Sequence, residues 1–449
     1  MKQLPLEYTA RMQEILGDGY EDYLLELEKP PVKAFRVNTD KISLSDFEKL
    51  NTFSNCKVPY VENAFYLDYE KIGNHPYHHA GMIYVQEPAA MAPVECIDIN
   101  PEWKVLDMCA APGGKSTQIK NKLGKSGVLV SNEIISSRCK ILTGNVERLG
   151  LQNTVTTCLD SKKIAEIFPK TFDMIMVDAP CSGEGMFRKE EIAVSEWSLQ
   201  NVERCAKRQT EILENAVKAL KEGGYIVYAT CTFSLEENEK MIDWFLQNHP
   251  EFELVPVNER VRKHTVDGIS FEGCKCQNIH CARRFYPHIS KGEGQFMAVL
   301  HNTNEPFSVV VKQTKPQKID NTIFEFLDDV LTDYKKENVR LYNGKAVYFT
   351  PDFEIKDGAA FSCGVTIGEI KKNYIQPHHQ FFMALGIQFK RKIELKCDEA
   401  EVTKYLHGEE ITADCPNGWA VVMVDGCALG GAKVVNGTAK NHYPKGLRK

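Results

Sequence analysis

The chain has no long hydrophobic run. None of its apolar stretches approaches the roughly 20 residues that a membrane-spanning helix needs. Its first residues, 1–8, lack the apolar core of a secretory signal peptide. An excess of positive charge is also missing, since the formal net charge is −6, so any contact with RNA has to use local basic patches. These absences predict a cytoplasmic protein with no membrane partner.

The cysteines lack the spacing of a metal site or a disulfide framework. Because a cytoplasmic protein keeps its thiols reduced, we expect the 15 cysteines to be free. Three clusters raise the question of a metal: Cys274, Cys276 and Cys281 with His280 beside them, His78 with His79, and His378 with His379. None of them supplies two separated C-x-x-C pairs, so we predict no metal site.

A length of 449 residues predicts about three domains. The pattern changes along the chain, from short helices and strands to a regular alternation, and then past a polar stretch at 301–320 to short strands. We assign residues 1–99 to an N-terminal α+β region, 100–301 to a central α/β domain, 302–384 to a linker and intermediate domain, and 385–449 to a β-rich C-terminal region.

The central region predicts a doubly wound, mostly parallel, Rossmann-like sheet. Apolar stretches typical of buried strands alternate with helical segments such as 138–149. The expected strands are 104–108, 127–131, 155–159, 172–178 and 225–230. In sheets of this class ligands bind at the carboxyl ends of the strands.

A turn rich in small residues follows the first of these strands and leads into a helix that is expected to start near Gly113. Small residues let the backbone approach a ligand closely, and the first turn of the helix offers free N–H groups. The turn is not a Walker phosphate loop, because Cys109 stands where that loop has its first glycine. This difference argues against ATP as the ligand.

Carboxylates end three further strands: Glu133, Asp160 and Asp178. Any one of them alone is better explained as a solvated loop residue or a helix cap. Together, at successive strand ends, they favour an adenosyl cofactor, because an acid after the second strand suits ribose hydroxyls and one after the third suits a nucleobase amine.

Two cysteines follow the ends of the fourth and fifth strands, Cys181 in Asp178-Ala-Pro-Cys181-Ser-Gly183 and Cys231 after Thr230. Both thiols are therefore expected in the cofactor crevice, whereas most other cysteines are expected to be buried small hydrophobes. A thiolate that adds to carbon 6 of a pyrimidine makes carbon 5 nucleophilic, and a second thiol can assist the later release. A protonated Asp178 could bond the N3 edge of the base, which would be presented outside its stack.

These motifs resemble those of the Sun/Nop family of RNA (cytosine-5)-methyltransferases, and most closely its bacterial RsmF branch, which acts on small-subunit ribosomal RNA. The resemblance covers most of the chain. It rests on the central motifs 109–115, 178–183 and 229–239, on the N-terminal motifs 35–39 and 85–91, and on 284–288, 294–298, 418–431 and 440–448. It implies S-adenosyl-L-methionine as the cofactor, 16S ribosomal RNA or the small subunit as the partner, an RNA-binding N-terminal region and a PUA-like RNA-binding module at 385–449.

The resemblance also implies individual roles. The cofactor loop falls on Cys109, Ala110, Ala111, Pro112, Gly113, Gly114 and Lys115. Ribose, adenine and methionine contacts fall on Glu133, Asp160 and Asp178 in that order, with Asp178 also beside the reacting base. Cys231 is the nucleophile, and Cys181 serves release of the product. Gln295 departs from the pattern, since many relatives carry phenylalanine there, and this puts substrate details in doubt.

Three alternatives stay open from the sequence. The same chemistry could act on transfer RNA, or the chain could be a non-catalytic RNA-binding assembly factor, although pure binding needs neither thiol. An amino-group methyltransferase would instead carry an Asn/Asp-Pro-Pro-aromatic turn at 178–181. A basic stretch at 259–291 and the basic C-terminal end are candidate phosphate contacts or ordinary solvated segments.

Overall fold

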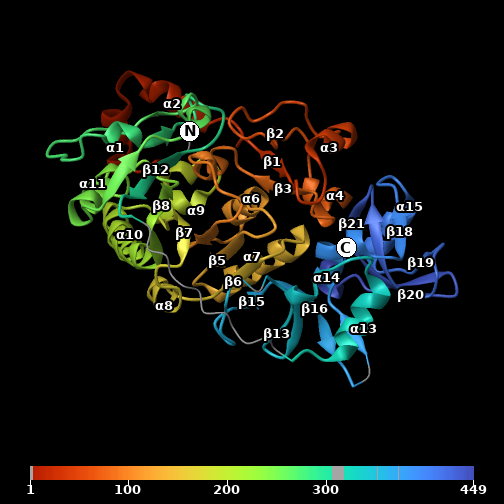
Figure 1. The fold of residues 1–449 in the computed structure, drawn as a ribbon. Coiled ribbons are helices and arrows are strands. Elements are labelled where there is room, and N and C mark those ends of the chain that lie inside the picture. Colours follow the sequence, from red (N-terminus) through yellow and green to blue (C-terminus); the bar gives the residue numbers. More distant parts are fainter. Residues whose placement is uncertain (1–3, 306–317, 351, 373, 449) are drawn as a thin grey trace.

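The computed structural model describes residues 4–305, 318–350, 352–372 and 374–448 (Figure 1). Most of the expected linker at 301–320 therefore lies outside the described residues. Four sheets organise the chain, with three, ten, four and five strands. Among the described helices, none is long and apolar enough to cross a membrane.

The ten-stranded sheet has the expected Rossmann-like core. Its neighbouring strands follow the order β10-β11-β12-β8-β7-β4-β5-β6-β15, and β9 pairs with β12. The parallel strands are β4 (Lys104–Asp107), β5 (Val128–Asn132), β6 (Thr154–Thr157), β7 (Phe172–Asp178) and β8 (Leu220–Thr230). Antiparallel strands are β9 (Phe252–Val255), β10 (Val266–Asp267), β11 (Arg283–Phe285), β12 (Gln295–Asn302) and β15 (Ser362–Cys363). The prediction of a mostly parallel α/β core is confirmed.

Helices between the strands complete this core, and several of their ends follow local sequence signals. The main ones are α6 (Gly114–Lys122), α7 (Ser136–Leu149), α8 (Ser161–Ile167), α10 (Leu199–Ala219) and α11 (Glu239–Asn248). Asp160 and Ser198 cap α8 and α10 by accepting backbone N–H bonds, and α7 ends at Gly150, whose φ of 68° suits glycine.

The N-terminal segment has two parts that pack in different places. Helices α1 (Leu6–Leu16) and α2 (Tyr20–Leu27) place Tyr8, Met12 and Tyr23 in a buried cluster that includes Phe187 and Phe233, near the two cysteine loops. A three-stranded antiparallel sheet follows, made of β1 (Ala34–Val37), β2 (Ala64–Tyr66) and β3 (Ile83–Gln86), with α3 (Leu44–Leu50) beside it. The segment is thus part of the wall around the crevice.

The C-terminal third forms two more sheets. One contains β13 (Val339–Tyr342), β14 (Lys345–Tyr348), β16 (Val365–Ile370) and β17 (Ile375–Pro377), with α13 (Asn321–Val330) and α14 (His379–Leu385). The other contains β18 (Lys392–Leu395), β19 (Ile411–Thr412), β20 (Gly418–Val424), β21 (Cys427–Val435) and β22 (Thr438–Asn441), with α15 (Ala400–His407). Between β14 and β16 the chain contributes β15 to the edge of the central sheet.

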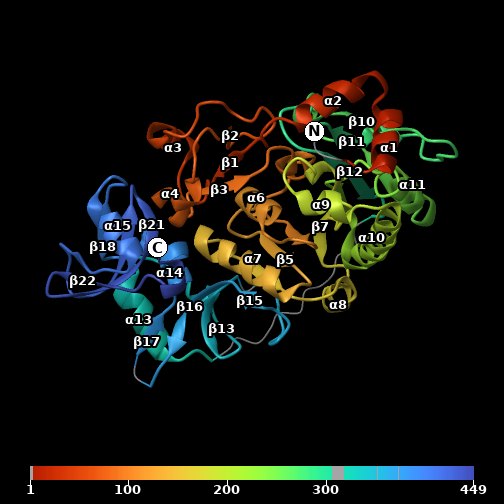
Figure 2. The same cartoon turned by 180° about the vertical axis from the view of Figure 1, so that it is seen from behind.

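The N-terminal sheet and the last sheet lie side by side in both views (Figures 1 and 2). The Tyr77 hydroxyl donates to Asp425 Oδ2 at 3.0 Å, and the Tyr443 hydroxyl lies 3.2 Å from Nδ1 of His79. Apolar residues of both sheets, such as Phe35 and Val422, belong to one buried cluster. The N-terminal sheet and the last sheet therefore share a buried apolar interface.

Ion pairs neutralise several arginines of the basic stretch at 259–291. It therefore offers fewer free positive charges for phosphate contacts than its sequence suggests. Arg260 pairs with Asp98, Arg262 with Glu259 and Arg283 with Asp267. Arg284 is buried beside the equally buried Glu239, donates from Nε to Glu239 Oε1 at 2.6 Å, and donates from Nη1 to the carbonyl of Phe233 at 2.9 Å. Arg284 therefore supports the loop that follows β8.

We expect the change Arg284→Ala to lower the free energy of unfolding by about 3–5 kcal/mol, because it leaves the Glu239 carboxylate buried without its partner. Urea denaturation measures this loss. The control Arg262→Ala removes an arginine side chain that is 58% exposed and should change stability by less than about 0.5 kcal/mol. Equal effects of the two changes would contradict the structural role of Arg284.

Candidate functional site

The carboxyl ends of β4, β7 and β8 open into a cavity of about 450 Å³. The N-terminal sheet contributes Gln86 to its wall, and the strand β12 contributes Gln295. From the candidate residues the cavity gathers Cys109, Ala110, Ala111, Pro112, Gly114, Lys115, Asp178 and Cys231. The parallel sheet thus brings together side chains that lie more than 100 residues apart in the sequence.

Backbone hydrogen bonds and contacts from the N-terminal segment hold the loop after β4 in place. Ala110 donates its N–H to the carbonyl of Asn132, and Gly113, with φ 111°, occupies a left-handed conformation just before α6. The buried Arg36 of β1 donates from Nη2 to the Gly114 carbonyl and to Thr117 Oγ1, both at 2.7 Å. The loop therefore depends on a strand from outside the central domain.

An ion pair between the buried Lys115 and the partly exposed Asp178 lines the cavity. Lys115 Nζ is 2.7 Å from Asp178 Oδ2. Burial opposes the charged form of Lys115, but the Asp178 carboxylate outweighs it and raises the pKa of Lys115 above its ordinary value. As a carboxylate, Asp178 can accept a hydrogen bond from an amino group.

The two cysteines from the ends of β7 and β8 are in direct contact. Cys181 Sγ lies 3.2 Å from Cys231 Sγ. Its hydrogen bond with Cys231, together with burial, raises the pKa of Cys181 well above its ordinary value. Burial likewise raises the pKa of Cys109, the third thiol here, so both Cys109 and Cys181 hold their protons at neutral pH.

A network of buried acids holds the two cysteine loops in place. Glu237 accepts hydrogen bonds from the Ser182 backbone at 3.0 Å and from the Gln209 amide at 2.8 Å. Glu184 accepts from Trp197 Nε1 and from the Phe233 backbone, at 2.8 and 2.9 Å. The Gly185 N–H donates to the carbonyl of Cys231 at 2.9 Å, which joins the two loops directly.

The remaining acids lie apart from this centre. Glu133 is buried, accepts the N–H of Ile135 and pairs with Arg138 at 3.2 Å, while Arg138 also donates to the Ala111 carbonyl at 2.8 Å. Asp160 caps α8 and is half exposed. Neither acid is among the residues that line the 450 Å³ cavity, although Arg138 connects Glu133 to it.

The structure adds two residues that the sequence analysis did not place in the site. Asp107 at the end of β4 accepts from Ser116 Oγ at 2.6 Å, and burial raises the pKa of Asp107 to about 7. Its Oδ1 has no hydrogen-bond partner among the described residues, and the same holds for Nε2 of Gln295, which is 2% exposed. Both side chains line the cavity, so each can bond a ligand there.

The strand-end reasoning used for Glu133, Asp160 and Asp178 would also have found Asp107, had it been applied to the first strand. Gln295 stood out in the sequence only as a departure from a motif. Within the described part of the chain, no group of three or more Cys, His, Asp or Glu side chains has the arrangement of a metal site.

Three family models match successive parts of the chain. The N-terminal domain of 16S rRNA methyltransferase RsmF matches residues 4–88, 16S rRNA methyltransferase RsmB/F matches residues 94–301, and the RsmF PUA domain matches residues 392–449. Together they include every residue that lines the cavity except Ala90, and they include the sheet β18–β22.

Curated relatives and solved structures agree with these matches. The chain is 30% identical to ribosomal RNA small subunit methyltransferase F of Klebsiella pneumoniae (strain 342), over 99% of this chain and 96% of that protein. It is 31% identical to the protein of the same name from Vibrio campbellii, over 99% and 97%.

A methyltransferase homologue from Pyrococcus horikoshii shares 31% identity, with a TM-score of 0.60 over 67% of this chain and 96% of that one. NSun6 of the same organism, solved with SFG, shares the fold at 21% identity, with a TM-score of 0.57 over 67% and 99%. From its motifs, its cavity and these matches along its whole length, the chain belongs to the RsmB/F family of 16S rRNA methyltransferases.

Proposed function

We propose that this protein methylates carbon 5 of cytosine in 16S ribosomal RNA, with S-adenosylmethionine as the methyl donor. The observation that carries the proposal is the pair of thiols, Cys181 and Cys231, in contact at 3.2 Å beside the Lys115–Asp178 ion pair. A methyltransferase that acts on an exocyclic amine or a hydroxyl needs no thiol. A pyrimidine carbon needs one, because the ring must first be made nucleophilic.

The cavity fits the proposed cofactor. The unpartnered Oδ1 of Asp107 offers an acceptor for a cationic amino group, and the first N–H groups of α6 offer donors for a carboxylate. Glu133, held by Arg138, is the proposed partner of ribose hydroxyls, and Asp160 of the adenine amine. When bound, the cofactor supplies an electrophilic methyl group.

Cys231 is the proposed nucleophile because Cys181 keeps its proton. The raised pKa of Cys181 keeps its proton in place, 3.2 Å from Cys231, and the Cys231 sulfur is the one proposed for attack. The Cys231 sulfur loses its proton to solvent and forms a bond to carbon 6, and the electron pair of the ring double bond becomes available at carbon 5, where it forms the bond to the methyl group. Later the carbon 5 proton leaves, its electron pair restores the double bond, and the bond to Cys231 breaks. Cys181 is placed to assist this release.

Lys115 and Asp178 are the proposed clamp for the target base. The ammonium of Lys115 can donate to the carbonyl oxygen O2 or to N3, and the Asp178 carboxylate can accept from the exocyclic amine of cytosine. Gln295 adds an unpartnered amide donor on the same wall. The site lies inside the cavity, so the base has to leave its stack.

The parts of the chain around the central domain have matching proposed roles. We assign 1–99 and the PUA-like segment 385–449 to RNA binding, 100–301 to catalysis, and 302–384 to an intermediate domain that connects them. A ribosomal RNA substrate also supports the cytoplasm as the site of action.

The protein is expected to form labelled 5-methylcytidine in 16S RNA, or in small subunits, when it is incubated with labelled S-adenosylmethionine. Nucleoside mass spectrometry detects the product. We expect Cys231→Ala to abolish turnover, and Cys181→Ala to leave the protein bound to RNA after denaturation, because elimination stalls.

The control Cys205→Ala removes a buried thiol on α10 and should keep turnover. Label found only in transfer RNA would make transfer RNA the substrate. Label on an exocyclic amine would refute the thiol mechanism. A stalled adduct with Cys231→Ala would reverse the roles of the two cysteines.

Cofactor affinity should depend on pH through Asp107. Its carboxyl is largely protonated below pH 7, so binding an ammonium group there has to displace a proton. We expect affinity to rise by up to about tenfold per pH unit below pH 7 and to level off above it. Calorimetric titration with S-adenosylmethionine from pH 6 to pH 8 measures the slope.

Asp107→Asn should weaken binding at pH 8 and flatten this slope, whereas Asp98→Asn, at a carboxylate that is 85% exposed, should preserve both. An unchanged slope in Asp107→Asn would show that another group controls the titration.

A further inference from the structure

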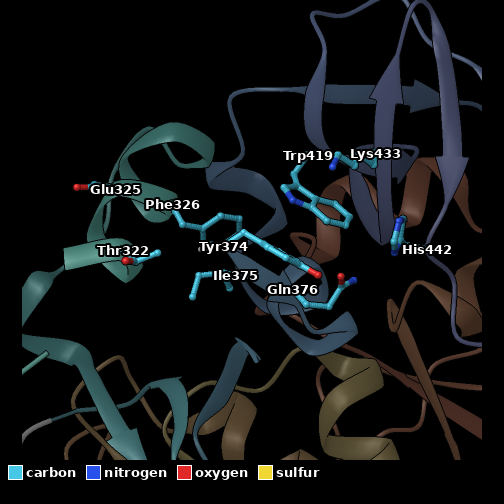
Figure 3. A pocket seen from close by; sticks show the side chains of 9 residues that line it. All are labelled: Thr322, Glu325, Phe326, Tyr374, Ile375, Gln376, Trp419, Lys433 and His442. Carbon is cyan, nitrogen blue, oxygen red and sulfur yellow. The ribbon is translucent and has the colours of Figure 1, made fainter. Parts of the chain in front are cut away.

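A second pocket, of about 500 Å³, lies far from the thiols, where the intermediate region meets the last sheet. Figure 3 shows Tyr374 between the residues of α13 on one side and Trp419, Lys433 and His442 on the other. Its lining also includes Phe326 and Gln376. The pocket thus combines residues of two separate sheets and one helix.

Aromatic rings dominate this pocket, and their faces are not all covered. Tyr374 is 57% exposed. Trp419 is partly exposed, with its ring 4.5 Å from the His442 ring and 6.2 Å from that of Phe382 behind it. Instead of packing inside the protein, these rings line a concave site on its surface. Flat aromatic groups that stay open in this way suit the stacking of another flat group.

Positive charge continues from the pocket across the sheet. Trp419 of β20 pairs with Lys433 of β21, and Lys433 pairs with Lys440 of β22. Residues paired in this way point to the same face of a sheet, so the ring and the two lysines form one row. Both lysines are exposed and form no ion pair with any residue of the described chain. The Lys433 ammonium lies 5.6 Å from the Trp419 ring centre.

We propose that this pocket binds one unpaired nucleobase of the RNA substrate, stacked between Tyr374 and Trp419, while Lys433 and Lys440 contact the adjoining phosphates. The inference deepens the proposed function and rests on it. A volume of about 500 Å³ falls within the range of small-molecule sites and admits a base with its ribose. The single acid in the lining, Glu325, opposes a phosphate at its own end but can accept from a ribose hydroxyl.

The binding test uses the full-length protein and a fluorescent oligoadenylate decamer, with anisotropy as the measurement. We expect Tyr374→Ala to weaken binding roughly tenfold, because it removes one stacking surface. Tyr374→Phe keeps the ring and should stay within about twofold of the unchanged protein. Tyr374 makes no side-chain hydrogen bond with the described residues, so both variants should fold.

Phosphate contact is tested by salt dependence. Lys433→Ala should reduce the slope of log affinity against log salt by about 0.7, the value for one phosphate of a single strand. The matched control is Lys345→Ala, an exposed lysine on β14 outside the pocket, which should leave the slope unchanged. A duplex of equal length should compete poorly, since its bases cannot reach the rings.

Equal affinity of Tyr374→Ala and the unchanged protein for the decamer would overturn the proposal, as would competition by the duplex as strong as by the single strand. A methylation assay on 16S RNA then tests the role of this pocket separately from the proposed catalytic mechanism. We expect Tyr374→Ala to raise the KM for RNA while kcat stays unchanged. If the unchanged protein methylates no RNA, the catalytic proposal fails, whereas decamer affinities still decide the role of the pocket.

Discussion

The parallel direction of β4, β7 and β8 is the constraint on which the rest of the site depends. Because these strands run the same way, their carboxyl ends meet at one edge of the sheet, and each delivers one chemical group there. The strand β4 supplies the loop with Lys115, β7 supplies Asp178 and then Cys181, and β8 supplies Cys231. The 3.2 Å contact of the thiols follows directly from the pairing of β7 with β8.

Parts of the chain outside this sheet hold the delivered groups in position. The Arg36 guanidinium reaches the first turn of α6 from the N-terminal sheet, and Glu184 and Glu237 tie the cysteine loops to the backbone around them. These are buried polar contacts in which each partner satisfies the other. They explain why the motifs at 35–39 and 229–239 belong to the same site, although neither motif contains all of the reactive groups.

The sequence predicted the central sheet well, because buried parallel strands are apolar, short and separated by helical patterns. It also brought Cys181 and Cys231 together, since both follow strand ends, and their sulfurs lie 3.2 Å apart, although only Cys231 lines the 450 Å³ cavity. The pairing of β15 with β6 was not predictable, because two residues, Ser362 and Cys363, carry no periodic pattern.

The burial and pairing of charged side chains were predicted less well than the fold. Arg284 in a basic stretch is buried against Glu239, and an acid 45 residues away leaves no local signal.

The short strand β15 has a consequence for how the protein is made. During synthesis on the ribosome the central strands emerge first, and β6 then has one open edge until residues 362–363 arrive. An open strand edge can pair with another chain, so newly made copies are vulnerable to association during this interval. Because β15 lies in the C-terminal third, this edge of the central sheet is covered only late in synthesis.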